Sequence, residues 1–245
     1  MGVAYGSSTI YQATKASFQD DLLLNIDAAA SNVNGTVIYD LSGRNENGTL
    51  TNNPAFNKSF GGYFTFDGTD DRIETNYTTA LSNSDFTYEV WVRYTVSNQV
   101  ANIFSKRTSS NSYEQLTLFI SGSPNGSASG AKICVFDSRS GVRSYASPSN
   151  YNDGQWHHVV LSADQSLNDK LYIDNTLIAT ITASQGSATH NSPLIIGAGS
   201  DGASPYSGRV NHLNGDIAVA RAYNRALTAT EVAQNFNVTR HRFGI

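Results

Sequence analysis

DGQWHHVVLS, residues 153–162, is the stretch that decides the fold. Its Asp-Gly pair predicts a tight turn, because Asp bonds to nearby backbone amides and Gly tolerates a positive φ. The β-branched and aromatic residues after the turn predict a strand. A hairpin follows, with strands at 170–174 and 176–181 around Asp174-Asn175. This part of the chain therefore predicts antiparallel sheet.

The same kind of pattern continues on both sides of this stretch. Residues 86–94 (FTYEVWVRY) alternate between an apolar face and a face that carries Glu89, Trp91 and Arg93. Further strands are predicted near residues 22–27, 62–68, 70–74, 100–105, 113–120, 131–137, 141–146, 194–197 and 215–223. Many short strands at close spacing predict an all-β sandwich or barrel.

One helix is predicted, near the end of the chain. Thr228 and Glu231 form a capping box, in which each side chain binds a free backbone amide of the other residue. Val232 and Phe236 are four residues apart and give the helix an apolar stripe. We expect this short helix to lie against the sandwich with both side chains facing inward.

Length and composition indicate one domain. The chain has 245 residues, a net charge of −4 and only 15% charged residues. No broad basic face is implied, which argues against nucleic acid as a partner.

No apolar stretch is long enough to span a membrane, and the start of the chain does not resemble a signal peptide. The single cysteine, Cys134, is expected to be buried in a strand.

The chain divides into residues 1–20, an N-terminal arm, and residues 21–245, the domain. The arm is polar but carries Tyr5, Ile10, Tyr11 and Phe18. We expect these side chains to contact neighbouring chains, because an arm of this kind has no partner within the domain.

Several motifs in order resemble the laminin-G-like domains of the concanavalin A-like lectin/glucanase superfamily. They are residues 66–71 (FDGTDD), 86–92 (FTYEVWV), 153–159 (DGQWHHV), 171–175 (LYIDN) and 223–228 (YNRALT). The resemblance covers about residues 20–240. It implies an antiparallel two-sheet jelly-roll sandwich of the concanavalin A type, in which residues 22–27 pair beside residues 217–223.

The ending, residues 235–245 (NFNVTRHRFGI), resembles a subgroup found in virion proteins of tailed bacteriophages. This implies a non-enzymatic virion structural protein, in a tail fibre or as a capsid decoration, that binds the host surface or a neighbouring subunit. Its partners would be other virion proteins, copies of itself or a host-surface glycan. The alternative is a free, extracellular, carbohydrate-binding lectin-like module, and a less favoured third is a glycoside hydrolase or lyase.

The acidic residues argue against an enzyme. Glycosidases need a pair of carboxylates, and the relatives with this fold carry Glu-x-Asp-x-Glu on one strand. No Glu in this chain is followed two residues later by Asp. His157 and His158 are adjacent on a strand and point to opposite faces, so they cannot serve one site.

Calcium is the one metal that the resemblance implies, and no cofactor is required. Asp40, Asn45 and Asn47 offer the hard oxygen ligands that calcium prefers. Asp67, Asp70 and Asp71 form a second set. Relatives often carry a further Asp where this chain has Ala218. The competing interpretation is that these side chains cap turns.

Sugar binding requires an exposed aromatic ring with polar groups beside it. Tyr145, Tyr151 and Tyr206 lie in or near predicted loops and are the candidates. Packing at the rim of the sandwich is the alternative explanation for each of them.

Overall fold

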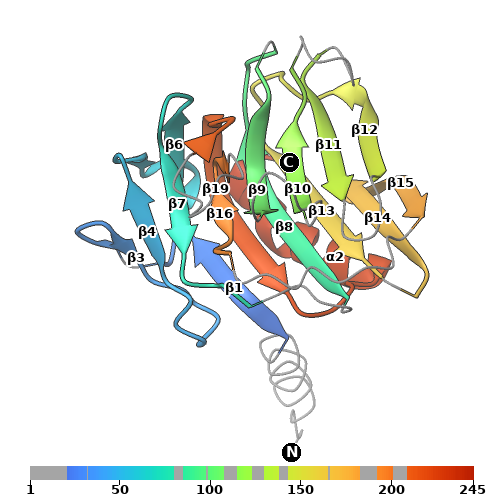
Figure 1. Cartoon of the computed structure of the whole chain (residues 1–245), viewed down its shortest axis with the longest axis horizontal. Coiled ribbons are helices and arrows are strands. Elements are labelled where there is room, and N and C mark those ends of the chain that lie inside the picture. Colours follow the sequence, from blue (N-terminus) through green and yellow to red (C-terminus); the bar gives the residue numbers. More distant parts are fainter. Residues whose placement is uncertain are drawn as a thin grey trace, which may run out of the picture.

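The computed structural model describes residues 21–31, 33–79, 85–97, 99–107, 115–122, 130–137, 143–164, 166–182, 192–200 and 209–245. Two antiparallel sheets pack face to face, and one short helix lies on the outside of one sheet (Figure 1). This confirms the predicted two-sheet sandwich. The predicted arm, residues 1–20, lies outside the described residues.

We call the sheet that carries the helix the helix-side sheet. Its strand order is β15-β14-β13-β8-β19-β6-β5, and β1 also pairs with β19. The bounds are β1 (Leu22–Asp27), β5 (Ala55–Asn57), β6 (Tyr63–Asp67), β8 (Phe86–Arg93), β13 (His157–Ala163), β14 (Asn168–Ile173), β15 (Thr176–Thr182) and β19 (Asn214–Tyr223). Leu22 stands opposite Tyr223 and Asp27 opposite Val219, which confirms that the first and last strands pair.

The second sheet, which we call the far sheet, has the order β12-β11-β10-β9-β16-β7-β4-β3-β2. The bounds are β2 (Val33–Asn34), β3 (Val37–Ile38), β4 (Gly48–Thr51), β7 (Arg72–Thr75), β9 (Ala101–Arg107), β10 (Gln115–Ile120), β11 (Lys132–Asp137), β12 (Arg143–Asn150) and β16 (Ile195–Ile196). A separate two-stranded ribbon joins β17 (Gly199–Ser200) to β18 (Arg209–Val210). The pairs β2–β3 and β17–β18 and the strand β5 were not predicted, because two or three residues show no alternation.

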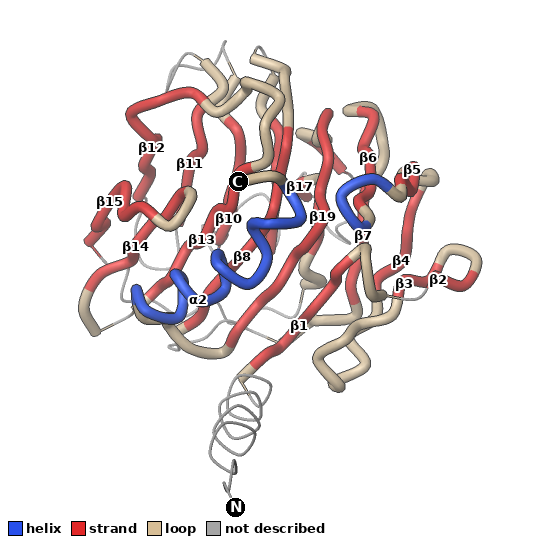
Figure 2. Tube along the Cα trace, turned by 180° about the vertical axis from the view of Figure 1, so that it is seen from behind, coloured by secondary structure: helices blue, strands red, loops and turns tan. Residues whose placement is uncertain are grey.

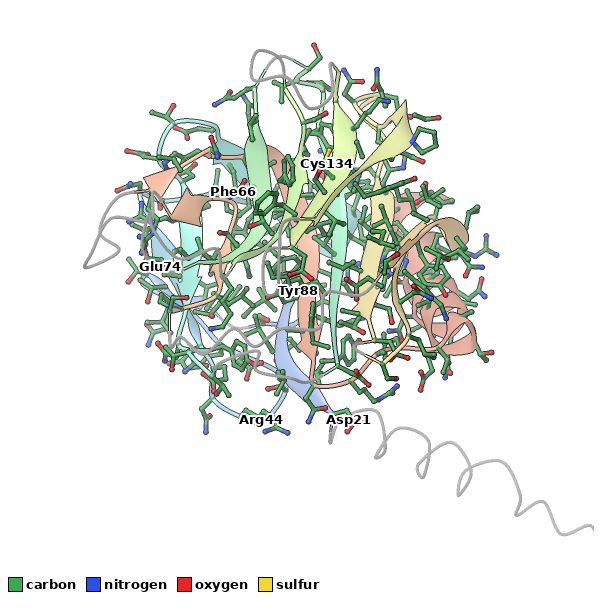
Figure 3. The ribbon with its side chains drawn as sticks, turned by 45° about the vertical axis from the view of Figure 1, so that its right-hand side comes forward. Asp21, Arg44, Phe66, Glu74, Tyr88 and Cys134 are labelled. Carbon is green, nitrogen blue, oxygen red and sulfur yellow. The ribbon has the colours of Figure 1, made fainter. Side chains whose placement is uncertain are left out.

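The main core fills the space between the sheets. Phe66 and Tyr88 lie near the middle of the molecule, whereas Asp21 and Arg44 lie at its periphery (Figure 3). The Tyr88 ring stacks on Phe104 of the far sheet, with ring centroids 4.8 Å apart. Cys134 is buried as predicted, and burial raises the pKa of its thiol. Burial of this apolar surface is the main force that holds the two sheets together.

The helix α2 (Ala229–Thr239) runs across the outer face of the helix-side sheet (Figure 2). Its capping box is present: the Glu231 amide donates to Thr228 Oγ1, and the Thr228 amide donates to the Glu231 carboxylate. Val232 and Phe236 are buried, as the apolar stripe predicted. A short 3-10 helix, η2 (Arg240–Phe243), continues the cover, and Phe243 stacks on Trp91 with ring centroids 4.2 Å apart. Both tryptophans, Trp91 and Trp156, are buried as predicted, in this outer layer.

A charged network lies between the helix and the sheet. The Glu89 carboxylate is fully buried. It accepts hydrogen bonds from Arg221 Nη1 (3.1 Å), from the Tyr223 hydroxyl (2.7 Å) and from Asn235 Nδ2 of the helix (2.8 Å). His158 Nε2 lies 3.0 Å from the same carboxylate. Burial alone would raise the pKa of Glu89, but the charge of Arg221 and these hydrogen bonds outweigh burial and hold it well below its ordinary value.

This network predicts a large cost for removing the charge of Glu89. Glu89→Gln keeps the side-chain shape but leaves the Arg221 guanidinium under the helix without its counter-charge. We expect the free energy of unfolding to fall by about 3–5 kcal/mol, measured by urea denaturation.

The matched control is Glu74→Gln. Glu74 pairs with Arg72 and Arg209, but its side chain is 29% exposed, so a loss of about 1 kcal/mol or less is expected. Equal losses for the two variants would contradict the structural role given to Glu89.

Candidate functional site

The helix covers only part of the outer face of its sheet, and the uncovered part carries a row of polar side chains. Thr65 on β6, Asp216 on β19 and Arg93 on β8 stand directly opposite one another on three adjacent strands. Arg93 donates from Nε (2.8 Å) and Nη2 (2.7 Å) to Asp216 Oδ2. The Thr65 hydroxyl donates to Asp216 Oδ1 at 2.6 Å. Three strands thus present one connected polar group.

A β-bulge in β19 brings this row and the Glu89 network to the same face. Asp216 and Arg221 are five residues apart, so strict alternation would point them to opposite faces. The register shifts between Ile217 and Val219, and both Ala218 and Val219 face the helix, while Ile217 and Ala220 face the main core. The extra residue restores the outward direction of Asp216.

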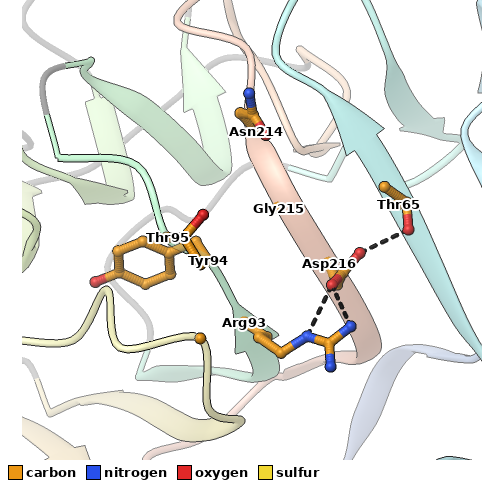
Figure 4. A pocket seen from close by; sticks show the side chains of 8 residues that line it. Thr65, Arg93, Tyr94, Thr95, Asn214, Gly215 and Asp216 are labelled. Carbon is orange, nitrogen blue, oxygen red and sulfur yellow. Dashed lines mark hydrogen bonds and ion pairs between the residues drawn. The ribbon is translucent and has the colours of Figure 1, made fainter.

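The row forms one wall of an open pocket of about 310 Å³, which we call the rim pocket (Figure 4). Its lining residues are Thr65, Arg93, Tyr94, Thr95, Gly154, Asn214, Gly215 and Asp216. Gly215 is required in the wall, because a Cβ there would lie 2.7 Å from the Arg93 carbonyl oxygen. The pocket therefore offers hydroxyl, amide, carboxylate and guanidinium groups.

Three aromatic rings lie around the guanidinium of Arg93, in addition to its contact with Asp216. Its guanidinium carbon lies 4.9 Å from the centroid of the Trp156 ring, 5.1 Å from that of Tyr63 and 5.5 Å from that of Phe60. Such cation–π contacts hold the guanidinium in place. Burial tends to lower the pKa of Arg93, but the bonds to Asp216 outweigh burial and raise it. Arg93 is therefore a fixed positive charge with a fixed partner.

Phe60 is exposed, and its backbone is strained. It lies within a short 3-10 helix, η1 (Ser59–Gly61), with φ 52° and ψ 31°, and 39% of the residue is exposed. A bulky residue in this left-handed region costs about 1–3 kcal/mol and persists only where neighbours enforce it. Arg242 is one such neighbour: its guanidinium donates to the carbonyl oxygens of Phe60 (3.1 Å) and Gly62 (3.2 Å). An exposed aromatic ring is thus held beside the rim pocket.

The structure describes two of the three predicted tyrosines, and neither of them lines the rim pocket. Tyr145 is half-buried against the core, and its hydroxyl donates to the Ile178 carbonyl oxygen at 3.3 Å. Tyr151 is half-buried, and its ring meets the His157 ring edge to face at a centroid distance of 5.0 Å. Tyr206 lies outside the described residues. Packing accounts for the two tyrosines that the structure describes.

The Asp40 loop is held together by its own hydrogen bonds. Asp40 Oδ1 accepts from the amides of Asn25 (2.8 Å) and Ser42 (2.9 Å), and Oδ2 accepts from the Ser42 hydroxyl and the Glu46 amide. The Asp40 amide donates to Asn47 Oδ1 at 3.0 Å. Asn45 adopts a left-handed φ of 61°. These contacts are those of turn capping, and calcium binding at this loop stays a prediction.

The second predicted calcium set is compact. Ligand oxygens of Asp67, Asp70 and Asp71 all lie within 4.8 Å of one another. Asp67 accepts from the amides of Thr69 (2.7 Å) and Asp70 (3.3 Å), and the Thr69 bond is the main reason that its pKa is lowered. Burial raises the pKa of Asp71. Turn capping uses these carboxylates too, and calcium binding here also stays a prediction.

Sequence reasoning missed the rim pocket. Glu89, Trp91 and Arg93 were correctly placed on one face of a strand, but Thr65, Asn214 and Asp216 come from distant parts of the sequence. The one local signal was the exposed Phe60 before two glycines, a pattern of a chain that needs left-handed backbone.

The hydrogen bonds of Asp40 predict the result of its removal. Asp40→Ala deletes an acceptor for the four donors described above, three of them backbone amides, and charge-assisted bonds contribute more than neutral ones. We expect the free energy of unfolding to fall by about 2 kcal/mol or more in buffer that contains a calcium chelator. A loss that appears only after calcium is added would show instead that Asp40 acts as a metal ligand.

Solved structures support the fold. The binding domain of Paraclostridial Mosquitocidal Protein 1 superposes with a TM-score of 0.65 at 17% identity, covering 90% of this chain and 52% of that one. The binding domain of botulinum neurotoxin DC in complex with rat synaptotagmin II gives 0.65 at 16% identity, covering 90% and 52%. A structure on cell entry of botulinum neurotoxin type C, dependent upon interaction with two ganglioside molecules, gives 0.63 at 14% identity, covering 92% and 53%.

The chain spans about half the length of these structures, and identities this low show the fold alone. Comparison with curated proteins gives no match. The family comparison matches residues 67–233, more than half of the chain, and this range includes most of the rim pocket. The chain therefore belongs to the concanavalin A-like lectin/glucanases superfamily, as its motifs indicated.

Proposed function

We propose that this protein is a non-enzymatic binding module that recognises a glycan at the rim pocket. The observation that carries the proposal is the connected row of Thr65, Asp216 and Arg93 beside the exposed ring of Phe60. A sugar presents hydroxyl groups at its edge and C–H groups on its ring face. A polar wall next to an aromatic ring suits both surfaces at once.

The comparisons support a binding role in general. The similar structures are described as binding domains or receptor-binding domains, one in complex with rat synaptotagmin II and one that concerns two gangliosides. Because this chain corresponds to about half of each, their partners are carried over only as a class of ligand, the glycan.

The carboxylates support a role without catalysis, although the superfamily name includes glucanases. Glu89 lies on the outer face of its strand under the helix, but it is fully buried and bonded to Arg221, Tyr223 and Asn235. In the described part of the chain, Asp216 is the one carboxylate that lines the rim pocket. Glycoside hydrolysis by the two-carboxylate route requires a pair.

For the setting of this module we propose a bacteriophage virion, in a tail fibre or a capsid decoration. The support is the resemblance of residues 235–245 together with an apolar hollow of about 410 Å³ at the β5 edge of the sandwich, which suits contact with a neighbouring subunit. Val33 and Phe56 line this hollow and are 44% and 49% exposed. A free extracellular lectin is the alternative, and detection of the protein in purified virions would decide between them.

The test of glycan binding removes the ring of Phe60. Phe60→Ala deletes the exposed aromatic ring, which also contacts Tyr63, Trp156 and Phe243 of the buried outer layer, so thermal melting must first show that the variant is folded. Binding to an array of neutral and acidic oligosaccharides is expected to weaken about tenfold, the equivalent of about 1.4 kcal/mol of lost aromatic contact.

Phe56→Ala is the matched control, because Phe56 is also exposed but lies on β5 beside the apolar hollow. Its binding is expected to equal that of the unaltered protein. Equal weakening by the two variants, or no glycan binding by the folded protein, would contradict the proposal.

A further inference from the structure

The charges of the rim pocket decide which class of glycan it accepts. Among the described residues that line it, Arg93 is the one cationic side chain and Asp216 the one anionic side chain. They pair at 2.7 Å, and their side chains are only 23% and 14% exposed. In such a partly buried pair the two charges are weakly screened by water, so each largely cancels the other at the pocket wall.

The guanidinium of Arg93 is already engaged on its edge and its face. The Nε and Nη2 edge is one of the two edges of a guanidinium that can form two parallel bonds with a carboxylate or sulfate of a ligand, and Asp216 occupies it. The rings of Trp156 and Tyr63 lie within cation–π distance. An acidic sugar that used this edge would have to displace Asp216 and leave that carboxylate without its partner, which is costly at a partly buried site.

The Asp216 carboxylate still has capacity for a ligand hydroxyl. A carboxylate offers about four acceptor positions, and here Thr65 and the two nitrogens of Arg93 occupy three. Because Thr65 donates its proton to Asp216, its own oxygen is left to accept from a ligand. Thr95 and Asn214 add a hydroxyl and an amide, which both donate and accept. The wall therefore matches neutral hydroxyl groups.

One neighbouring charge acts in the same direction. Asp153 precedes the pocket residue Gly154, and its carboxylate is 58% exposed and lies 3.1 Å from His157 Nε2. A carboxylate next to the pocket, although not in its lining, repels an anionic ligand by an amount that salt reduces.

We infer that the rim pocket selects uncharged sugars and that Asp216 is the residue that sets this preference. The inference rests on the proposed function, because it specifies the ligand of the same site. Asp216 acts in two ways: it accepts a hydroxyl of the neutral sugar, and it cancels the charge of Arg93 that would otherwise attract an acidic sugar.

The test removes the charge of Asp216 and keeps the shape of the side chain. The probe is an array of neutral, uronic-acid and sulfated oligosaccharides of matched length. The unaltered protein is expected to bind neutral members. In Asp216→Asn these signals should fall at least tenfold, while acidic members gain at least tenfold because Arg93 is freed. Both gains and losses are compared at equal protein concentration and low salt.

Two variants separate this effect from damage to the fold. Thr65→Val keeps the Arg93–Asp216 pair and removes one hydroxyl, so it should weaken neutral binding without any gain for acidic sugars. Asp153→Asn removes a charge outside the pocket and should change neutral binding less than twofold. If Asp216→Asn does not fold, Thr65→Val decides. A gain of binding to acidic sugars in Thr65→Val would overturn the inference. Weaker binding to neutral sugars without such a gain would support it.

Different results would contradict the inference and the proposed function. If the unaltered protein binds mainly acidic oligosaccharides and Arg93→Gln abolishes that binding, the preference is wrong but the glycan site stands. If the folded protein binds no member of the array, or if neither Phe60→Ala nor Asp216→Asn changes binding, the glycan site itself is wrong.

Discussion

The buried carboxylate of Glu89 is the constraint on which the rest of the outer layer depends. A buried charge is tolerated only with its partners in place, and here the partners come from β19, β13 and α2. Arg221 stands directly opposite Glu89 and also bonds Asn25 of β1. One misplaced strand would leave several of these groups unpaired, so the network fixes the register of the strands and the seat of the helix together.

The site follows from where that helix ends. Asn235 anchors α2 over Glu89, and the next turns of chain place Phe236 and Phe243 on Trp91. Arg242, one residue earlier, bonds Asp27 on β1 and the backbone of Phe60. The end of the cover thus becomes the aromatic border of the rim pocket. Residues 235–245 therefore have a structural task in this layer. No helix among the described residues is long and apolar enough to cross a membrane.

Local patterns made most of the fold predictable, and long-range geometry made the site unpredictable. The alternation in residues 86–94, the turn at Asp153 and the capping box at Thr228 each need only neighbouring residues, and the structure confirms them. The rim pocket requires three strands in register and a bulge in β19, and the local periodicity of the sequence predicts neither. The predicted tyrosines did not indicate it, because Tyr145 and Tyr151 pack against the sandwich and do not line the rim pocket. Phe60 followed by two glycines was a better signal in the sequence, because it indicates left-handed backbone.

The most direct test of a glycan site at the end of the helix cover is an amide NMR titration with a neutral oligosaccharide that the protein binds. The account predicts shift changes that centre on Thr65, Gly154 and the segment 214–216, with Phe60 at their border. Amides of β11 and β12 should keep their positions. Shift changes confined to the Asp40 loop or to the region of Tyr145, with the pocket amides unmoved, would contradict the account.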